Sequence, residues 1–214
     1  MSDVISKKIE KELNEYVNFK KDFQFTFKDI INKGKVQYCE DFLICDEEGN
    51  YIPECDKWIN VGYKIKNSLS KLLSNLYPYE FVFRGFHLKS IEAFFQCIKF
   101  KDPIIQQMIF NYYGTDAYHI QATSCYDWKE TGYIYWQGHP IKRDSSEYDM
   151  LVDELYISAA QNPLYRQALK SVTNPIIHSI GKTLKSETVF TRYEFERELN
   201  SLSAFLKHID QGHQ

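Results

Sequence analysis

Residues 90–101 read SIEAFFQCIKFK, and this stretch decides how the middle of the chain folds. Read as a helix, it has apolar side chains at i, i+3, i+4 and i+7, the spacing of one helical face. These residues are Ile91, Phe94, Phe95 and Ile98. Further apolar residues cover most of the opposite side, so the helix is apolar nearly all round. We therefore expect a buried helix with Ser90 as its N-cap.

A narrow polar stripe remains on this helix. Glu92, Gln96 and Lys99 lie at i, i+4 and i+7 along one edge. One interpretation is a stabilising Glu/Lys pair covered by other side chains. The other is a catalytic edge, because burial shifts the pKa values of carboxyl and amino groups toward neutrality. The sequence leaves both interpretations open.

Composition excludes several classes of protein. The net charge is −3, so the chain has no overall nucleic-acid signature and any such contact must be local. Five cysteines without CxxC or Cys/His spacing indicate reduced thiols and no structural zinc. No apolar run has transmembrane length, and MSDVISKKIEKE at the start is too charged for a secretory signal. We expect a cytoplasmic protein without membrane contact, and no cofactor or metal.

The pattern along the chain predicts an α+β fold, a mainly helical single domain with small antiparallel sheet elements. Residues 1–66 are expected to form an N-terminal extension, a helix over 3–20 and then short strands, packed on a main domain of residues 67–210. The main domain has several further expected elements. They are turn residues in 73–81, a hairpin over 81–88 turning at Arg84-Gly85, a helix from Pro103 to near Gly114, a loop over 121–146, helices over 146–161 and 163–172, strand material in IIHSIG and TVF, and a last helix opened by a Thr191/Glu194 capping box.

Several separated strings resemble one family in their order and spacing. They are LSNLYP (73–78), SIEAFFQCIKF (90–100), LYRQAL (164–169), HSIGK (178–182) and ETVFTRYEF (187–195). Over roughly residues 70–206 the chain resembles the YbiA-like, or NADAR, family. The resemblance implies a fold of that type and an N-glycosidase that hydrolyses a ribosyl C1′–N bond. The implied ligand contains ADP-ribose, with ADP-ribosylated guanine in DNA, RNA or a nucleotide as the expected substrate.

By the same resemblance, specific residues receive roles. Glu92 and Lys99 would be catalytic. The substrate-binding residues would be Ser74, Asn75, Tyr77, Gln96, Trp136 and Arg143. Apart from the resemblance, the position of His139 in the expected loop favours it among the histidines for contact with the ligand. Where many relatives carry Ala-Lys after a glycine, this chain has Ala117-Tyr118 after Gly114. That difference mildly favours a non-catalytic binder of NAD-derived nucleotides.

The residues themselves suit cleavage at a sugar C1 atom. Such a bond breaks through an oxocarbenium-like transition state, which needs negative charge or a nucleophile at C1 and a proton for the leaving group. Lys99 is the expected nucleophile, forming a Schiff base, and Glu92 its acid/base partner. The resemblance also implies an enzymatic alternative, the hydrolysis of a small N-ribosyl metabolite of the riboflavin pathway. Lys142 and Arg84 are alternates to Arg143 for phosphate, and His178 is at least as well explained as a core histidine.

Overall fold

The computed structural model describes residues 2–23, 37–38, 44–45, 58–64, 67–120 and 127–211, the first of these ranges with side chains from residue 6 onward and the two short ranges by their backbone. The fold is α+β with helices dominating, which confirms the predicted class. The helices of these ranges are α1 Ser2–Asp22, α3 Ser68–Leu72, α4 Ile91–Cys97, α5 Pro103–Phe110, α6 Gly114–Tyr118, α7 Trp128–Thr131, α8 Ser146–Ala159, α9 Pro163–Lys170 and α10 Arg192–Gln211. No helix in the described ranges combines the length and apolar content that a membrane span requires.

The strands pair in twos. They are β1 Gln37–Tyr38, β2 Ile44–Cys45, β3 Ile59–Asn60, β4 Phe81–Phe83, β5 Phe86–Leu88, β6 Tyr133–Trp136, β7 His139–Lys142 and β8 Ile176–Ile177. The pairs β1–β2, β4–β5 and β6–β7 are antiparallel, and the sequence did not reveal that β3 and β8 pair in parallel. The predicted strand QFTF (24–27) and the predicted turn DEEGN (46–50) lie outside the described residues.

The predicted hairpin over 81–88 is present, with its turn at the expected place. Arg84 and Gly85 have φ angles of 48° and 83°, so both central turn residues are left-handed. A two-residue turn of this kind matches the right-handed twist of the paired strands. The hairpin packs on α8 through β4 and delivers the chain to the start of α4.

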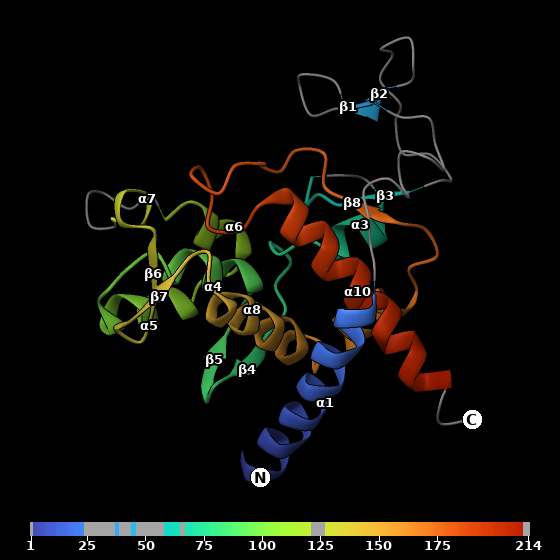
Figure 1. Ribbon diagram of the computed structural model, residues 1–214, viewed down its shortest axis with the longest axis horizontal. Coiled ribbons are helices and arrows are strands. Elements are labelled where there is room, and N and C mark those ends of the chain that lie inside the picture. The colour runs from blue at the N-terminus through green and yellow to red at the C-terminus, as the bar shows by residue number, and fades with distance from the viewer. Residues whose placement is uncertain are drawn as a thin grey trace.

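Helix α4 is the buried centre of the molecule, as its sequence predicts. The Ser90 Oγ atom accepts a hydrogen bond from the Ala93 N–H at 3.1 Å, which caps the helix. Ile91, Phe94 and Ile98 have no exposed surface. Helices α5, α6 and α8 pack against α4, and Figure 1 shows it in the middle of the molecule with the β4–β5 hairpin below it. The helix ends at Cys97, earlier than the predicted 101.

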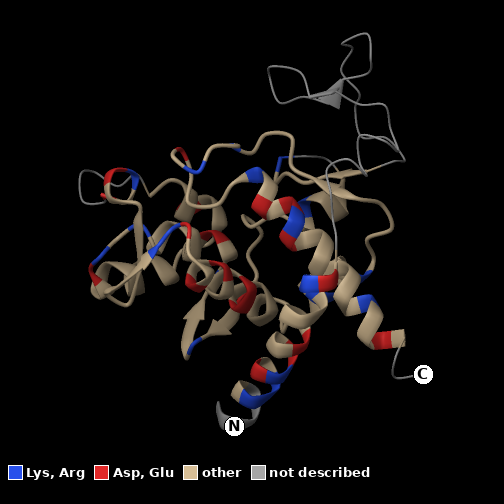
Figure 2. Cartoon of the chain, in the orientation of Figure 1, with Lys and Arg blue, Asp and Glu red and all other residues tan. Residues whose placement is uncertain are grey.

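Helix α1 packs against α8 and α10. Its inner face buries Tyr16, whose hydroxyl donates to Glu198 Oε1 at 2.7 Å. Lys20, one turn further on, pairs with both Asp153 of α8 and Glu198 of α10. Figure 2 shows charges of both signs along the outer part of α1, as expected for a solvated face.

Helix α10 opens and packs as predicted. Glu194 Oε2 accepts from the Thr191 N–H at 2.7 Å, and the Glu194 N–H donates to Thr191 Oγ1 at 3.3 Å, which completes the capping box. The apolar stripe of the helix is buried. It comprises Phe195, Leu199, Leu202 and Leu206. The predicted helices near 146–161 and 163–172 correspond to α8 and α9, the latter capped by Asn162.

Three predictions about the elements were wrong. The helix expected from Pro103 to near Gly114 ends at Phe110, and a separate helix, α6, begins at Gly114. At this glycine the Leu76 backbone lies so close that a Cβ atom would overlap it. The loop expected over 121–146 contains α7 and the β6–β7 hairpin, which turns at Gln137-Gly138. TVF is not a strand, because the Thr188 hydroxyl and the Phe190 backbone satisfy each other locally.

Candidate functional site

The polar edge of α4 forms a continuous chain of hydrogen bonds. The Gln96 Nε2 atom donates to Glu92 Oε1 at 2.6 Å, and the Lys99 Nζ atom donates to Gln96 Oε1 at 2.7 Å. Gln96 is 9% exposed, so its amide is held inside the structure. Glu92 and Lys99 are only partly buried, so part of each side chain is exposed to solvent. The structure thus brings together the two residues predicted to be catalytic, with Gln96 between them.

Burial shifts the pKa values of Glu92 and Lys99, the two residues at the ends of this series of hydrogen bonds. It raises the pKa of Glu92, although the hydrogen bond from Gln96 and the charge of Lys99 act in the opposite direction. Burial also lowers the pKa of Lys99, against the attraction of Glu92. The two pKa values therefore approach each other, as expected for a desolvated acid/amine pair.

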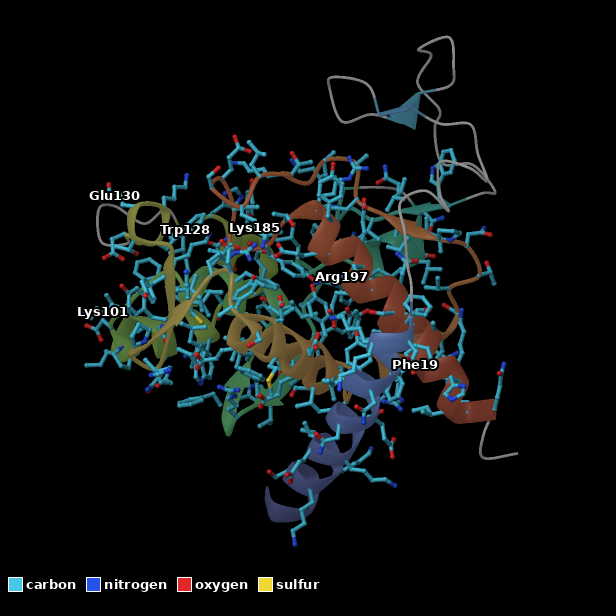
Figure 3. All side chains as sticks on the ribbon, in the orientation of Figure 1. Phe19, Lys101, Trp128, Glu130, Lys185 and Arg197 are labelled. Carbon is cyan, nitrogen blue, oxygen red and sulfur yellow. The ribbon has the colours of Figure 1, made fainter. Side chains whose placement is uncertain are left out.

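Two further lysines act on this edge. Lys129 of α7 and Lys182 of the segment after β8 both lower the pKa of Lys99 through charge repulsion. The Lys182 carbonyl accepts from the Arg192 N–H at 2.8 Å, which ties its segment to the start of α10. Figure 3 labels Trp128 of α7 and Lys185 of that same segment on one side of the molecule. The sequence motifs did not reveal the role of Lys182, since no spacing relates it to Lys99.

The turn before β4 supplies the other predicted neighbours of Glu92. The Glu92 N–H donates to the Asn75 carbonyl at 3.0 Å, and Asn75 Oδ1 accepts from the Tyr156 hydroxyl at 2.8 Å. Ser74 is buried, and its Oγ atom accepts from the Leu76 N–H at 3.3 Å. Asn75 therefore touches the start of α4, while Ser74 shapes the turn that holds it.

Tyr77 and Trp136 pack against other aromatic residues. The Tyr77 ring lies 4.6 Å from the Tyr79 ring, centroid to centroid. Trp136 is 7% exposed and contacts the rings of Phe83, Phe86, Phe94 and Phe110. These contacts make Trp136 a core residue, and its predicted place in a ligand pocket stays a prediction.

Arg143 and His139 do not contact the polar edge of α4. The Arg143 guanidinium is 4% exposed, donates to both oxygens of Glu194 at 2.9 and 2.6 Å, and lies 4.3 Å from the centre of the Tyr148 ring. A carboxylate thus already holds the group that we expected to contact phosphate. His139 is exposed and lies 3.1 Å from Glu147.

The alternative candidates also have structural partners. Arg84 forms a two-point pair with Glu154, with distances of 2.9 and 2.6 Å to Oε2. His178 Nδ1 lies 2.8 Å from the Val61 carbonyl, and burial lowers the pKa of its ring. These contacts suit the interpretation of His178 as a core histidine. Within the described ranges, no group of three or more His, Cys, Asp or Glu side chains is arranged to hold a metal.

A pocket of about 520 Å³ lies near the same turn but does not include Glu92 or Lys99. Its lining residues are Tyr63, Leu76, Pro78, Glu80, Tyr113, Gly114, Thr115 and Asn162. Leu76 follows Asn75 directly, so the pocket and the start of α4 share the 74–80 segment as a wall. The two features are therefore neighbours with separate linings.

Comparison with known proteins corrects the family suggested by the sequence strings. The family model that matches is described as bacteriophage protein GP30.3, and it covers residues 67–204. Searches of curated proteins and of solved structures found no match. The assignment to the YbiA-like, or NADAR, family was therefore wrong. The ADP-ribose ligand, the ADP-ribosylated nucleic acid and the N-glycosidase label rested on that resemblance and lose their support with it.

The short strings behind the resemblance have structural explanations of their own. SIEAFFQCIKF encodes a capped, buried helix, and ETVFTRYEF encodes the capping box of α10. Such strings recur wherever these elements are needed, so they are weaker evidence than a match across a whole domain. The match to residues 67–204 spans more than half of the chain. The chain belongs to the bacteriophage protein GP30.3 family.

Proposed function

We propose that the chain is an enzyme that uses Lys99 as an amine nucleophile and Glu92 as its acid/base partner. The supporting observation is the hydrogen-bond chain Glu92–Gln96–Lys99, at 2.6 and 2.7 Å. The electrostatics add to it, because burial raises the pKa of Glu92 and lowers that of Lys99. An amine attacks carbon only when it is neutral, and an acid donates a proton only when it is protonated.

The position of Gln96 fits such a pair. Its Nε2 atom donates to a Glu92 oxygen that accepts whether the carboxyl group is ionised or protonated. Its Oε1 atom accepts from Lys99, which has N–H bonds to donate in both the ammonium and the amine form. The proton can therefore reside on Glu92 or on Lys99 without loss of either hydrogen bond. The amide acts as a fixed spacer between the two groups.

The proposed substrate has a carbon at the aldehyde oxidation level that bears two heteroatoms. Lys99 Nζ attacks this carbon while the bond to the first heteroatom breaks, and protonated Glu92 gives its proton to that atom. The second heteroatom then leaves with a proton from Nζ, which gives a Schiff base on Lys99. The Glu92 carboxylate takes a proton from water, whose oxygen adds to the carbon, and returns that proton to Nζ as the carbon–Nζ bond breaks. The hydroxyl proton passes back to Glu92, so the aldehyde and the free amine are released and one water is consumed.

The alternative is that the pair is only a structural contact. Its hydrogen bonds would then serve to satisfy polar groups on a buried helix. Two observations favour the catalytic interpretation. Lys99 has no direct bond to Glu92 that would neutralise it, and Lys129 and Lys182 add positive charge that further lowers its pKa. A structural ion pair is stabilised by direct contact between its two charges and by the absence of further like charges nearby.

Reductive trapping tests the proposal. The chain is incubated with ribose 5-phosphate and sodium cyanoborohydride, and the modified lysine is identified by peptide mass analysis. We expect preferential labelling of Lys99 over the exposed Lys101, and loss of that label in Lys99→Arg, which keeps the charge but lacks a nucleophilic amine. Glu92→Gln should slow release of the aldehyde from the Schiff base while the protein stays folded. Equal labelling of Lys99 and Lys101 would overturn the proposal.

A further inference from the structure

The pocket beside the 74–80 segment has the size and chemistry of a small-molecule site. Its volume of about 520 Å³ falls within the range of about 300–1,000 Å³ that is typical of ligand pockets. Apolar groups from Leu76 and Pro78 and two tyrosine rings contribute to its walls. A carboxylate from Glu80 contributes the charge. This mixture suits a ligand that has a ring and a few polar groups.

A lysine ammonium group lies over each of the two tyrosine rings. Lys71 Nζ lies 5.0 Å from the centre of the Tyr63 ring, and Lys89 Nζ lies 4.8 Å from the centre of the Tyr113 ring. Cations at these distances are attracted by the ring faces. Among the described residues, neither lysine is paired with a carboxylate. Neither lysine is itself a lining residue, but both positive charges lie beside rings that line the pocket, and an anionic group of a ligand at these rings gains from them.

The Glu80 carboxylate is oriented by the protein and still has accepting capacity. Its Oε1 atom accepts from the Tyr113 hydroxyl at 2.7 Å. Its Oε2 atom lies 3.7 Å from His87 Nε2, which is too long for a hydrogen bond. An ionised carboxylate only accepts hydrogen bonds, so a ligand group that meets it must be an N–H or O–H donor. An amino group on a planar ring satisfies this requirement.

The base of the pocket is held in place by several tight contacts. Gly114 lies against the Leu76 backbone with no room for a side chain. Asn162 Nδ2 donates to the Glu80 carbonyl at 3.2 Å, while its Oδ1 caps α9 by accepting from the Leu164 N–H at 3.0 Å. The segment that carries Glu80 is thus fixed from both sides. A pocket formed in advance binds without an additional ordering cost.

We propose that this pocket binds a planar nitrogen heterocycle that bears an anionic substituent, which is the chemistry of a nucleotide. The ring packs against Tyr63 and Tyr113 and donates an N–H to Glu80. The anionic group lies toward Lys71 and Lys89. This binding is independent of the proposed reaction at Lys99, because the pocket has its own lining.

Titration calorimetry with three probes tests the proposal on the full chain. The probes are AMP, adenosine and inorganic phosphate, which separate the contributions of the ring and of the phosphate. We expect AMP to bind more tightly than either fragment. Lys71→Gln and Lys89→Gln should each weaken AMP about two- to fivefold, as for an exposed ion pair, and should leave adenosine unchanged. Tyr63→Leu should weaken AMP and adenosine together, and Lys101→Gln should change neither.

Two results would overturn the inference. One is the absence of AMP binding at millimolar concentration by a protein whose circular dichroism shows it folded. The other is AMP binding that survives the Lys71→Gln, Lys89→Gln and Tyr63→Leu changes, which would place the ligand elsewhere. Neither result depends on trapping at Lys99, and a failure to trap there leaves this binding test unaffected. The two proposals are therefore separable.

Discussion

Replacement of Lys20 by alanine removes the counterion of two buried carboxylates. The Lys20 side chain is 17% exposed, and its partners Asp153 and Glu198 are 9% and 2% exposed. Burial alone would lower the pKa of Lys20, but the two carboxylates outweigh this effect and raise it. Without the lysine, Asp153 and Glu198 face each other with like charge in a poorly hydrated space. The variant tests whether this cluster holds α1 on the domain.

The expected cost follows from the burial of the group that is left behind. Removal of one partner from a buried ion pair typically costs about 3–5 kcal/mol, because an uncompensated charge remains inside the protein. For a chain of this size each kcal/mol lowers the melting temperature by about 2–4 °C, so we expect a decrease of roughly 6–20 °C. The neighbouring Lys21→Ala is the matched control, since Lys21 is exposed and contacts only Asn18 among the described residues. Its cost should stay below about 0.5 kcal/mol.

The cost of Lys20→Ala should depend on pH in a defined direction. Burial raises the pKa of Asp153 to about 7, with a further contribution from Glu198. An unfolded aspartate titrates near 3.9, so between about pH 4 and 7 the folded state binds more protons and stability falls as pH rises. Lys20 stabilises the ionised form, so its loss should cost more at pH 8 than at pH 5.5. Urea unfolding at both pH values measures this, and a cost below 1 kcal/mol or the same cost at both pH values would refute the reasoning.

Three further predictions concern the site and its supports. In ¹³C-methylated protein followed by NMR, Lys99 should titrate below the ordinary lysine value of about 10.4, and Glu92→Gln should lower its pKa further because the attracting carboxylate is gone; a Lys99 pKa at or above that ordinary value would contradict this. Arg143→Lys should cost about 1–3 kcal/mol in chemical unfolding, since an ammonium cannot reproduce the two-point contact with Glu194, and a neutral result would show that the contact contributes little. Gly114→Ala should cost about 1–3 kcal/mol, because the added Cβ overlaps the Leu76 backbone, and an unchanged melting temperature would show that this contact yields easily.

The elements that were predictable from sequence are those in which a local pattern coincides with a buried face. The apolar spacing of 90–101, the Ser90 cap and the Thr191/Glu194 box each operate within a few residues, so the chain carries the complete signal locally. The β6–β7 hairpin was missed for the opposite reason. It turns at Gln137-Gly138 in the same conformation as the predicted Arg84-Gly85 turn, but its second strand contains Pro140, and a proline weakens the sequence signal for a strand.

The residues of the candidate site fall into the same two groups: those predictable from the local sequence and those that only the fold brings together. Glu92 and Gln96 were predictable as one edge because the helical repeat aligns them, and Lys99 joins this edge from the turn that directly follows α4. Lys129 and Lys182 reach that edge from segments far apart in sequence, and nothing in their local sequence indicates this. Arg143 shows the converse, since a cation in an apparently irregular stretch was taken for a ligand contact. Its carboxylate partner lies 51 residues further along the chain, so only the fold could reveal it.

The region that matches the family model contains two buried carboxylates whose counterion lies outside that region, in α1. Asp153 and Glu198 both lie within residues 67–204, yet the lysine that neutralises them lies at position 20. Two carboxylates that share a buried space cannot both ionise without a cation, so the matched region by itself would have to take up a proton or open the α8–α10 contact. Helix α1 therefore supplies the positive charge that neutralises these two carboxylates. A chain shortened to residues 67–204 should consequently regain stability with Glu198→Gln, because that change removes the charge that α1 otherwise neutralises.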